Sequence, residues 1–292
     1  MWTSIKKGLW GYIFVAPQLI LILAFMIIPI LTGITMGFKE YHFFASKWIG
    51  LANYQKILHS EIFWKALRVT TLYTILSISF GMTISLLLAE FISSLESRKL
   101  QTFFKGSFYL PCVCSMIVVS IIWIWLYHPT IGLINHLLSK VGLGPFLWLS
   151  SSKTALISLI MMGLFTGLGP TIIILVAGRQ AIPKTYYEAA RLDGATKRTL
   201  FFKITLPLLK PVILFILVIS TIWSYQVFQQ IYVMTEGGPS YSTTTLVYLI
   251  YAEAFSYFRF GKASAIALIL GIIIFAMTII QYRYLKGRVE YV

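Results

Sequence analysis

Six long apolar runs dominate the sequence and constrain every fold that it can adopt. They cover approximately Leu9–Met36, Leu67–Ile92, Ser107–Tyr127, Thr154–Ala177, Leu208–Met234 and Lys262–Tyr284. Each run is long enough for a spanning helix, which needs about 20 apolar residues to cross about 30 Å of hydrocarbon. Lipid offers no partner for backbone polar groups, which favours helices. We therefore expect an all-α integral membrane protein, with six transmembrane helices in a single domain over residues 1–292.

The composition supports this class. Charged residues make up 11% of the chain, whereas a soluble domain carries about 25%. The formal net charge of +15 could serve a nucleic acid, but nucleic-acid binders gather basic residues on one polar face. Here apolar runs separate the basic residues, so we expect basic loops between spans and no nucleic-acid partner. The first run is too long for a signal peptide and should remain as a span.

The distribution of Lys and Arg predicts which way the chain crosses the membrane. With the N-terminus inside, the cytoplasmic segments, which include Lys286 and Arg288, hold 15 of the 24 basic residues, and the outer segments hold 9. Cytoplasmic loops of membrane proteins carry the excess of Lys and Arg. We therefore expect both termini in the cytoplasm.

Proline and cysteine add two local expectations. Pro29 and Pro170 lie inside apolar runs and should mark kinks or broken helix ends. Cys112 and Cys114 lie in an apolar run beside Pro111. Two thiols without further ligands make a poor metal site. We interpret them as buried small apolar residues and expect no bound metal.

The longest cytoplasmic loop, residues 178–207, is predicted to form two short helices. Pro183 suits the first turn of a helix. Gly194 is placed to follow the end of that helix, and Thr196 can cap the next one. The sequence therefore predicts a sharp bend at Gly194, with Pro207 at the entry to the fifth run.

Three short motifs follow one another in this loop. They are Glu188-Ala189-Ala190, then Gly194, then Ile204-Thr205-Leu206-Pro207. Their order and spacing resemble the EAA loop of binding-protein-dependent ABC import permeases. An ordinary amphipathic helix on the membrane surface is the alternative. The resemblance implies that this loop couples to a separate ATPase through Glu188, Ala189, Ala190, Arg191, Asp193, Gly194, Ile204, Leu206 and Pro207.

The residue types of the loop suit that role. Small side chains at Ala189, Ala190 and Gly194 permit close approach to a partner. Glu188 and Arg191 can form charge-assisted hydrogen bonds across an interface. The chain has no P-loop of its own, because the Gly-Lys-small run at residues 261–263 lacks the upstream glycine and the following Ser or Thr. We expect no enzyme activity and no bound cofactor here, with ATP and Mg on the partner ATPase.

Further stretches resemble the sugar-permease branch called MalF-like. Phe14-Val15-Ala16-Pro17 and Trp48-Ile49-Gly50-Leu51-Ala52-Asn53-Tyr54 look like its opening, and Thr235-Glu236-Gly237-Gly238-Pro239 looks like its last outer loop. That branch imports di- and oligosaccharides and, in some members, glycerol phosphates. The resemblance implies a six-span, type I ABC importer permease in the inner membrane of a prokaryote. It also implies a heterodimer with a second homologous permease, two ATPase copies and an extracytoplasmic solute-binding protein.

Polar and aromatic residues inside the runs are the candidates for a substrate path, because such groups are costly against lipid. The fifth run is richest in them. Aromatic faces can cover the C–H surfaces of a sugar, and amides can bond its hydroxyls. The candidates are Trp223, Tyr225, Gln226 and Gln229, with Thr166 from the fourth run. Contacts with a partner permease use the same residue types and are the alternative.

Several functions compete with saccharide import by alternating access. An ABC permease for glycerol phosphate or a uronide oligosaccharide remains open, as does the exact sugar. An ion-coupled secondary transporter would need intramembrane carboxylates or His and usually inverted repeats, and the runs offer almost none of the former and show none of the latter. An intramembrane enzyme would need paired acid–base groups within the spans. The four His residues fall in outer loops instead.

Overall fold

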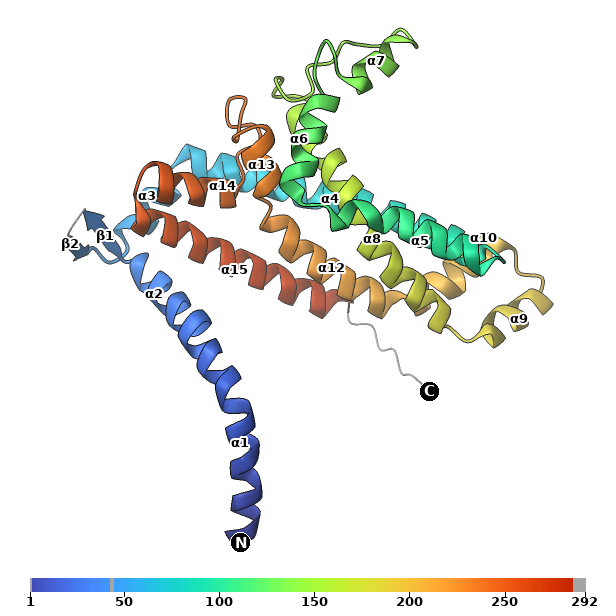
Figure 1. The fold of residues 1–292 in the computed structure, drawn as a ribbon, viewed down its shortest axis with the longest axis horizontal. Helices are drawn as coiled ribbons and strands as arrows, with labels where there is room; N and C mark the ends of the chain where they lie inside the picture. The colour runs from blue at the N-terminus through green and yellow to red at the C-terminus, as the bar shows by residue number, and fades with distance from the viewer. Residues whose placement is uncertain (1, 43–44, 286–292) are drawn as a thin grey trace. The chain divides into compact units, whose positions relative to one another are not determined.

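The structure is a computed structural model that describes residues 2–42 and 45–285 (Figure 1). The chain divides into two units, one of residues 1–60 with 250–269 and one of residues 61–249 with 270–292. Lys286 and Arg288, which contribute to the cytoplasmic charge count, lie outside the described residues. Helices make up most of the described chain, which confirms the predicted all-α membrane class.

The first unit begins with helices and a hairpin. Its elements are α1 (Trp2–Ile22), the π-helical turn η1 (Leu23–Ile27), α2 (Ile28–Met36), β1 (Lys39–His42), β2 (Ala45–Trp48), α3 (Ala52–Leu58) and the π-helical turn η3 (Ala252–Ser256). The antiparallel hairpin pairs Lys39 with Trp48 and Glu40 with Lys47. The sequence did not predict it, because the strands have four residues each and no apolar alternation.

The second unit holds most of the helices. They are α4 (Glu61–Ser94), α5 (Arg98–Val113), α6 (Met116–Leu126), α7 (Leu133–Ser139), α8 (Ala155–Ala181), α9 (Lys184–Leu192), α10 (Lys197–Leu200), the π-helical turn η2 (Phe201–Thr205), α11 (Leu206–Leu208), α12 (Lys210–Tyr225) and α13 (Gln229–Met234). Two helices, α14 (Leu246–Tyr251) and α15 (Phe260–Leu285), have residues in both units.

Among the described residues, five helices are long and apolar enough to cross a membrane. They are Gly11–Met36, Glu61–Ser94, Ala155–Ala181, Lys210–Met234 and Phe260–Tyr284. The pair α5 and α6 would supply a sixth span, but it is bent by 95°. The expectation of one continuous third helix over Ser107–Tyr127 is therefore wrong. Cys114 and Ser115 take extended backbone angles, with ψ of 144° and 131°, which ends the α-helical winding there.

The two prolines that were expected to disturb spans behave differently. Pro29 is the second residue of α2, two residues after the end of the π-helical turn Leu23–Ile27. Proline has no backbone N–H, so the turn before it loses a helical hydrogen bond, and a wider turn accommodates this loss. Pro170 lies inside α8, which continues unbroken from Ala155 to Ala181, so the broken end expected there is absent.

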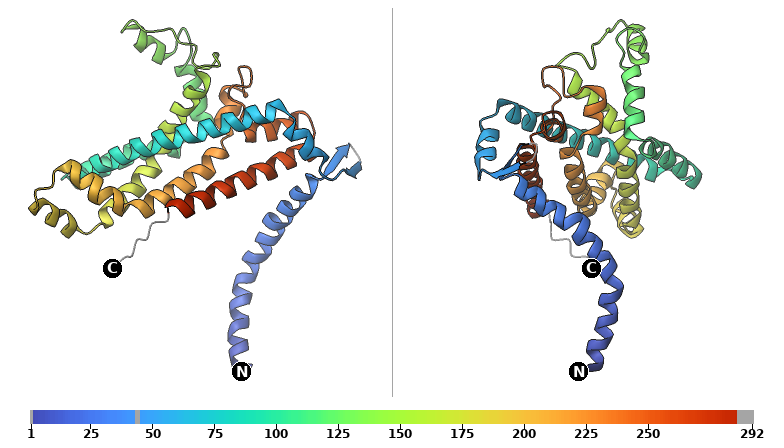
Figure 2. Two further views of the ribbon diagram at one scale, coloured as in Figure 1. Left: turned by 180° about the vertical axis from the view of Figure 1, so that it is seen from behind. Right: turned by 60° about the vertical axis from the view of Figure 1, so that its left-hand side comes forward.

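In the second unit, α8 packs along both α4 and α5, and α12 packs against α4 (Figures 1 and 2). Lipid tails are as apolar as Leu, so close backbone approach rather than burial from water holds such helices together. Gly169 provides this approach, because a Cβ placed there would lie 2.5 Å from the carbonyl oxygen of Phe108 on α5.

Two apolar clusters lie at different heights along α8. One contains Leu159 and Met162 of α8 with Tyr73 of α4. The other contains Ile172 and Leu175 of α8, together with buried side chains of α4 and α12. The stretch of α8 between them, residues 163–171, is free to border a cavity.

Candidate translocation cavity and coupling loop

A cavity of about 800 Å³ lies within the second unit, between the two apolar clusters of α8. Residues of α4, α5, α6, α8, α12 and α13 line it. Its polar lining consists of hydroxyl, amide and thiol groups, and none of the described lining residues is charged. Its volume falls in the range of small-molecule sites, about 300–1,000 Å³.

Two helix breaks border this cavity. One is the bend between α5 and α6, where Cys112, Cys114 and Met116 are lining residues. The other is the non-helical segment between α12 and α13, residues 226–228, all of which line the cavity. Irregular backbone at membrane depth is tolerated where it lines a cavity rather than facing lipid. The two breaks are therefore consistent with a polar path through the unit.

Four of the five residues predicted for the substrate path line this cavity: Trp223, Gln226, Gln229 and Thr166. The side chain of Trp223 is 71% exposed and so available to a ligand. Thr166 is buried, and its hydroxyl donates to the carbonyl oxygen of Gly163 at 3.1 Å in its own helix.

Tyr225, the fifth residue predicted for the path, does not line this cavity. Its side chain is buried, and its hydroxyl lies 3.4 Å from the Thr71 hydroxyl of α4. Successive helical residues differ by about 100° around the axis, so neighbours of Trp223 on α12 cannot all face the same cavity.

The two cysteines also differ from expectation. Cys112 and Cys114 were predicted to be buried, but both are exposed and line the cavity. The break at Cys114 and Ser115 separates α5 from α6 and leaves these side chains uncovered. The position of this break could not be predicted from Pro111, because α5 continues through Pro111 and ends at Val113.

A buried polar contact that the sequence did not predict fixes α13. The amide nitrogen of Gln230 lies 2.5 Å from the Tyr73 hydroxyl of α4 and 3.4 Å from the Leu159 carbonyl oxygen of α8. Gln230 is 3% exposed, although it borders the cavity. This contact holds α13 against α4 and α8, and so positions the neighbouring Gln229 at the cavity.

The predicted bend at Gly194 is confirmed. Gly194 has a φ of +78°, the left-handed conformation that suits glycine. The N–H of Ala195 donates to the carbonyl oxygen of Ala190 at 2.9 Å, and the N–H of Gly194 donates to that of Arg191 at 3.0 Å. These two bonds form a Schellman motif, which ends α9 and reverses the chain.

The second short helix is also present, and each of the two helices differs from the prediction in one detail. Thr196 caps α10, because its hydroxyl accepts from the N–H of Thr199 at 3.3 Å. After Leu200 the winding widens into η2, just before Pro207, in the same way as η1 precedes Pro29. Pro183 precedes α9 as its N-cap rather than lying in the first turn.

The loop presents one face outward and holds the other against the spans. Tyr187 and Leu200 belong to a buried cluster that Ala190, Ala195 and Ile204 also contact. Leu206 and Pro207 follow this cluster in α11 and are half-buried. The predicted coupling residues Glu188, Ala189, Arg191, Asp193 and Gly194 are exposed. Leu192, at the end of α9, is 90% exposed, an unusual position for a large apolar side chain.

A chain of polar contacts links this loop to the helices around the cavity. Arg179 of α8 donates two hydrogen bonds to the carboxylate of Glu90 on α4, at 2.7 and 3.1 Å. Its guanidinium carbon lies 5.2 Å from the centre of the Tyr187 ring on α9. The Tyr187 hydroxyl lies 3.0 Å from the buried Thr205 hydroxyl of η2. Arg179 therefore contacts both α4, which lines the cavity, and α9 of the predicted coupling loop.

Sequence reasoning missed this link, although one signal for it was available. Glu90 follows the apolar run Leu86-Leu87-Leu88-Ala89, and an ionisable residue in such a place is a functional candidate with a partner to be sought. Glu90 and Arg179 both lie near the ends of runs that cross in the same direction, so their ends meet on one side of the membrane.

The fold and these two sites define a class of protein. The chain is a multi-span helical subunit with an uncharged polar cavity and an exposed helix–turn–helix loop, and its sequence has no P-loop. These properties describe the membrane component of a transporter that obtains its energy from another subunit.

Comparison with known proteins identifies the family. The family described as "Binding-protein-dependent transport system inner membrane component" matches residues 81–290. The chain belongs to this family. It is therefore the permease subunit of an ABC importer, a multi-pass inner-membrane protein and not itself the ATPase.

Individual relatives agree over nearly the whole length. The chain is 34% identical to the probable ABC transporter permease protein YurN of Bacillus subtilis (strain 168), covering 96% of this chain and 97% of that protein. It is 30% identical to the sn-glycerol-3-phosphate transport system permease protein UgpA of Agrobacterium fabrum, covering 96% of each. The crystal structure of a bacterial ABC transporter that imports the acidic polysaccharide alginate matches with 25% identity and a TM-score of 0.88, covering 99% of each chain.

Proposed function

We propose that this permease carries an uncharged di- or oligosaccharide, with its cavity forming this subunit's share of the path. The observation that supports this most strongly is the lining of the cavity. It combines the exposed ring of Trp223 with the amides of Gln226 and Gln229 and with hydroxyl groups. Aromatic rings stack on the C–H faces of sugars, and amides both donate to and accept from sugar hydroxyls.

Anionic cargo is the second candidate, because relatives are named for sn-glycerol-3-phosphate and for alginate. A phosphate or carboxylate taken from water into a cavity needs cationic or multiple hydrogen-bond partners. The described lining residues include no Lys, Arg or His. The chemistry of this half of the path therefore favours a neutral saccharide over an anionic one.

The energy for transport is proposed to come from ATP and Mg bound on a partner. We propose that the exposed face of α9 docks on an ABC ATPase, two copies of which serve this chain and a second, homologous permease. A solute-binding protein would deliver the saccharide on the outer side. Closure of the ATPases would move the coupling loops and switch the cavity between outward and inward access.

ATPase stimulation of the complete importer tests the cargo. The complex would be reconstituted with its binding protein and offered neutral di- and oligosaccharides, uronide oligosaccharides, glycerol 3-phosphate and amino acids. We expect stimulation by at least one neutral saccharide. Stimulation by the anionic compounds alone would show that the cargo is anionic and contradict the proposed neutral saccharide. Stimulation by amino acids alone would show that the cargo is not a saccharide.

Two cavity substitutions give the matching prediction for this chain. Trp223→Ala and Gln229→Ala should each raise the KM for uptake about ten-fold, the effect of losing one interaction of about 1.4 kcal/mol. Basal ATPase activity should stay unchanged, because neither residue lies in the coupling loop. Gln55→Ala is the control, since this exposed Gln lies on α3 and outside the cavity. An equal KM for Gln229→Ala and Gln55→Ala would contradict the proposed path.

A further inference from the structure

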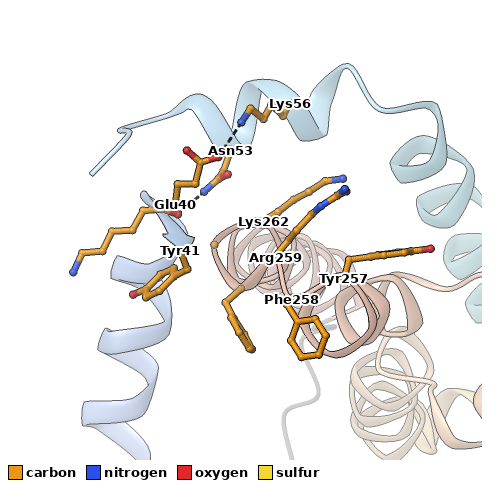
Figure 3. A pocket seen from close by; sticks show the side chains of 11 residues that line it. Glu40, Tyr41, Asn53, Lys56, Tyr257, Phe258, Arg259 and Lys262 are labelled. Carbon is orange, nitrogen blue, oxygen red and sulfur yellow. Dashed lines mark hydrogen bonds and ion pairs between the residues drawn. The ribbon is translucent and has the colours of Figure 1, made fainter. Parts of the chain in front are cut away.

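A second cavity, of about 620 Å³, lies within the other unit, where β1, α3 and the start of α15 meet (Figure 3). It shares no lining residue with the translocation cavity. The distribution of Lys and Arg in the sequence predicts that residues 235–260, which include the segment before α15, lie outside the membrane. We therefore call this second cavity the outer cavity.

Positive charge exceeds negative charge around this outer cavity. Four cations line it: Lys39, Lys56, Arg259 and Lys262. Two carboxylates pair with three of them. Lys56 lies 3.7 Å from Glu40, and the buried Glu253 is shared by Lys262 at 2.6 Å and Arg259 at 3.7 Å. Four cations against two carboxylates leave an excess of two positive charges.

The cations reach the cavity from different elements. Figure 3 shows Lys56 on α3 extending toward Glu40, with Lys262 and Arg259 on the opposite wall. The pairs at 3.7 Å are long for charge-assisted bonds, which are about 2.7–2.9 Å between N and O. The side chains of Lys56 and Arg259 are 60% and 62% exposed. An incoming anion can therefore bond both without first breaking a short ion pair.

Neutral polar groups complete the cavity. Asn53 is 5% exposed and donates through Nδ2 to the carbonyl oxygens of Gly37 and Lys39, both at 2.9 Å. Its Oδ1, an acceptor, has no hydrogen-bond partner among the described residues. The first-turn N–H groups of α15, on residues 260–262, likewise have no acceptor in the part of the chain that the structure describes. Helix N-termini favour anions, and an amide oxygen suits a hydroxyl group.

Strain at the cavity rim points to a ligand as well. Phe258 has a φ of +53°, a left-handed conformation that is unfavourable for a residue with a Cβ. Burial does not offset this cost, because the Phe258 side chain is 63% exposed, and the adjacent Tyr257 is 58% exposed. Residues held in sparsely populated backbone conformations cluster at active sites, ligand clamps and switch regions. Aromatic rings at the water interface also suit the boundary between lipid head groups and acyl chains.

We propose that this outer cavity binds a phosphate ester that carries free hydroxyl groups. Lys56, Arg259 and the first turn of α15 would bond the phosphate oxygens, and Asn53 Oδ1 would accept from a hydroxyl. The exposed rings of Phe258 and Tyr257 would cover the apolar part of the ligand. Two ligands share this chemistry. One is the head group of phosphatidylglycerol, a membrane lipid, and the other is glycerol phosphate dissolved in water.

Native mass spectrometry of the complete importer distinguishes the two sources. The complex would be purified from nanodiscs of phosphatidylcholine with phosphatidylglycerol, and the retained phosphatidylglycerol measured for the natural chain and for Lys56→Gln/Arg259→Gln. The control is Lys140→Gln/Lys153→Gln, which removes the same charge from the loop between α6 and α8. In parallel, the shift in Tm with glycerol 3-phosphate would be compared with that from chloride of equal ionic strength.

We expect the cavity variant to retain about ten-fold less phosphatidylglycerol than the control, the effect of about 1.4 kcal/mol of lost binding. A glycerol 3-phosphate shift in Tm that is lost only in the cavity variant would assign a soluble ligand instead. Equal lipid retention and equal Tm shifts in the two double variants would overturn the proposal. Lys56→Gln alone provides a milder variant should the double substitution lower the yield of complex, and the same comparisons apply to it.

Discussion

Replacing Gly194 by valine is expected to lower solute uptake about ten-fold or more, while the spans stay folded and the chain stays in the membrane. The φ of +78° at Gly194 costs a residue with a Cβ about 1–2 kcal/mol, and more for a β-branched one. No atom lies within 4 Å of a Cβ built there, so the effect comes from the backbone rather than from a clash. Relieving this strain would break the Schellman bonds and turn the exposed face of α9 away from its proposed contact with the ATPase.

Gly142→Val provides a closely matched control. Gly142 follows α7 with a φ of +75° and open space around its Cβ position. It also ends a helix through the same bonding pattern, with N–H donors of Gly142 and Leu143 on Ser139 and Leu138. The strain is therefore similar, but this loop lies on the other side of span 155–181 from the coupling loop. Equal uptake by the two variants in proteoliposomes would contradict the coupling role of the bend.

Arg179→Leu is expected to lower the number of solute molecules moved per ATP about ten-fold, with ATPase activity retained. The substitution removes both bonds to Glu90 and the contact with the Tyr187 ring. The Arg179 and Glu90 side chains are 21% and 32% exposed, so solvent screens the pair only in part, but both groups keep contact with water and the substitution does not leave a fully buried charge. The complex should therefore assemble, but movement of α9 would no longer reach α4 and α8 around the cavity.

Graded substitutions separate this link from a general effect of charge. Arg179→Lys keeps the charge but loses the two-donor fork, and should give an intermediate ratio of transport to ATP hydrolysis. Arg98→Leu removes the same charge from an exposed position at the start of α5 and should leave the ratio unchanged. Equal ratios for Arg179→Leu and Arg98→Leu would show that the contacts of Arg179 do not transmit the motion.

The features predicted from the sequence are those set by local chemistry. A run of about 20 apolar residues has few options in lipid besides a helix, so the spans followed from length and composition. The bend at Gly194 and the cap at Thr196 depend on bonds between residues at most five positions apart. Such contacts can be inferred without knowledge of the rest of the fold.

The features that were missed depend on distant contacts. Glu90 and Arg179 are 89 residues apart, and only the packing of α4 against α8 brings them together. Tyr225 was grouped with Trp223 because both are aromatic, but the direction of each side chain depends on where α4 packs against α12. The break at Cys114 and Ser115 occurs within an apolar run that would otherwise form one helix. Composition does not encode any of these.

The most direct test of the account is a photo-crosslink from Leu192 in the assembled importer. A photoreactive amino acid would replace Leu192, the 90% exposed residue at the end of α9. Leu137 on α7, which is 54% exposed, would serve as the control position. We predict that the Leu192 position crosslinks to the ATPase subunit and that the Leu137 position does not. Crosslinking of the Leu192 position to lipid alone, or to the outer binding protein, would contradict the claim that this loop couples the permease to its ATPase.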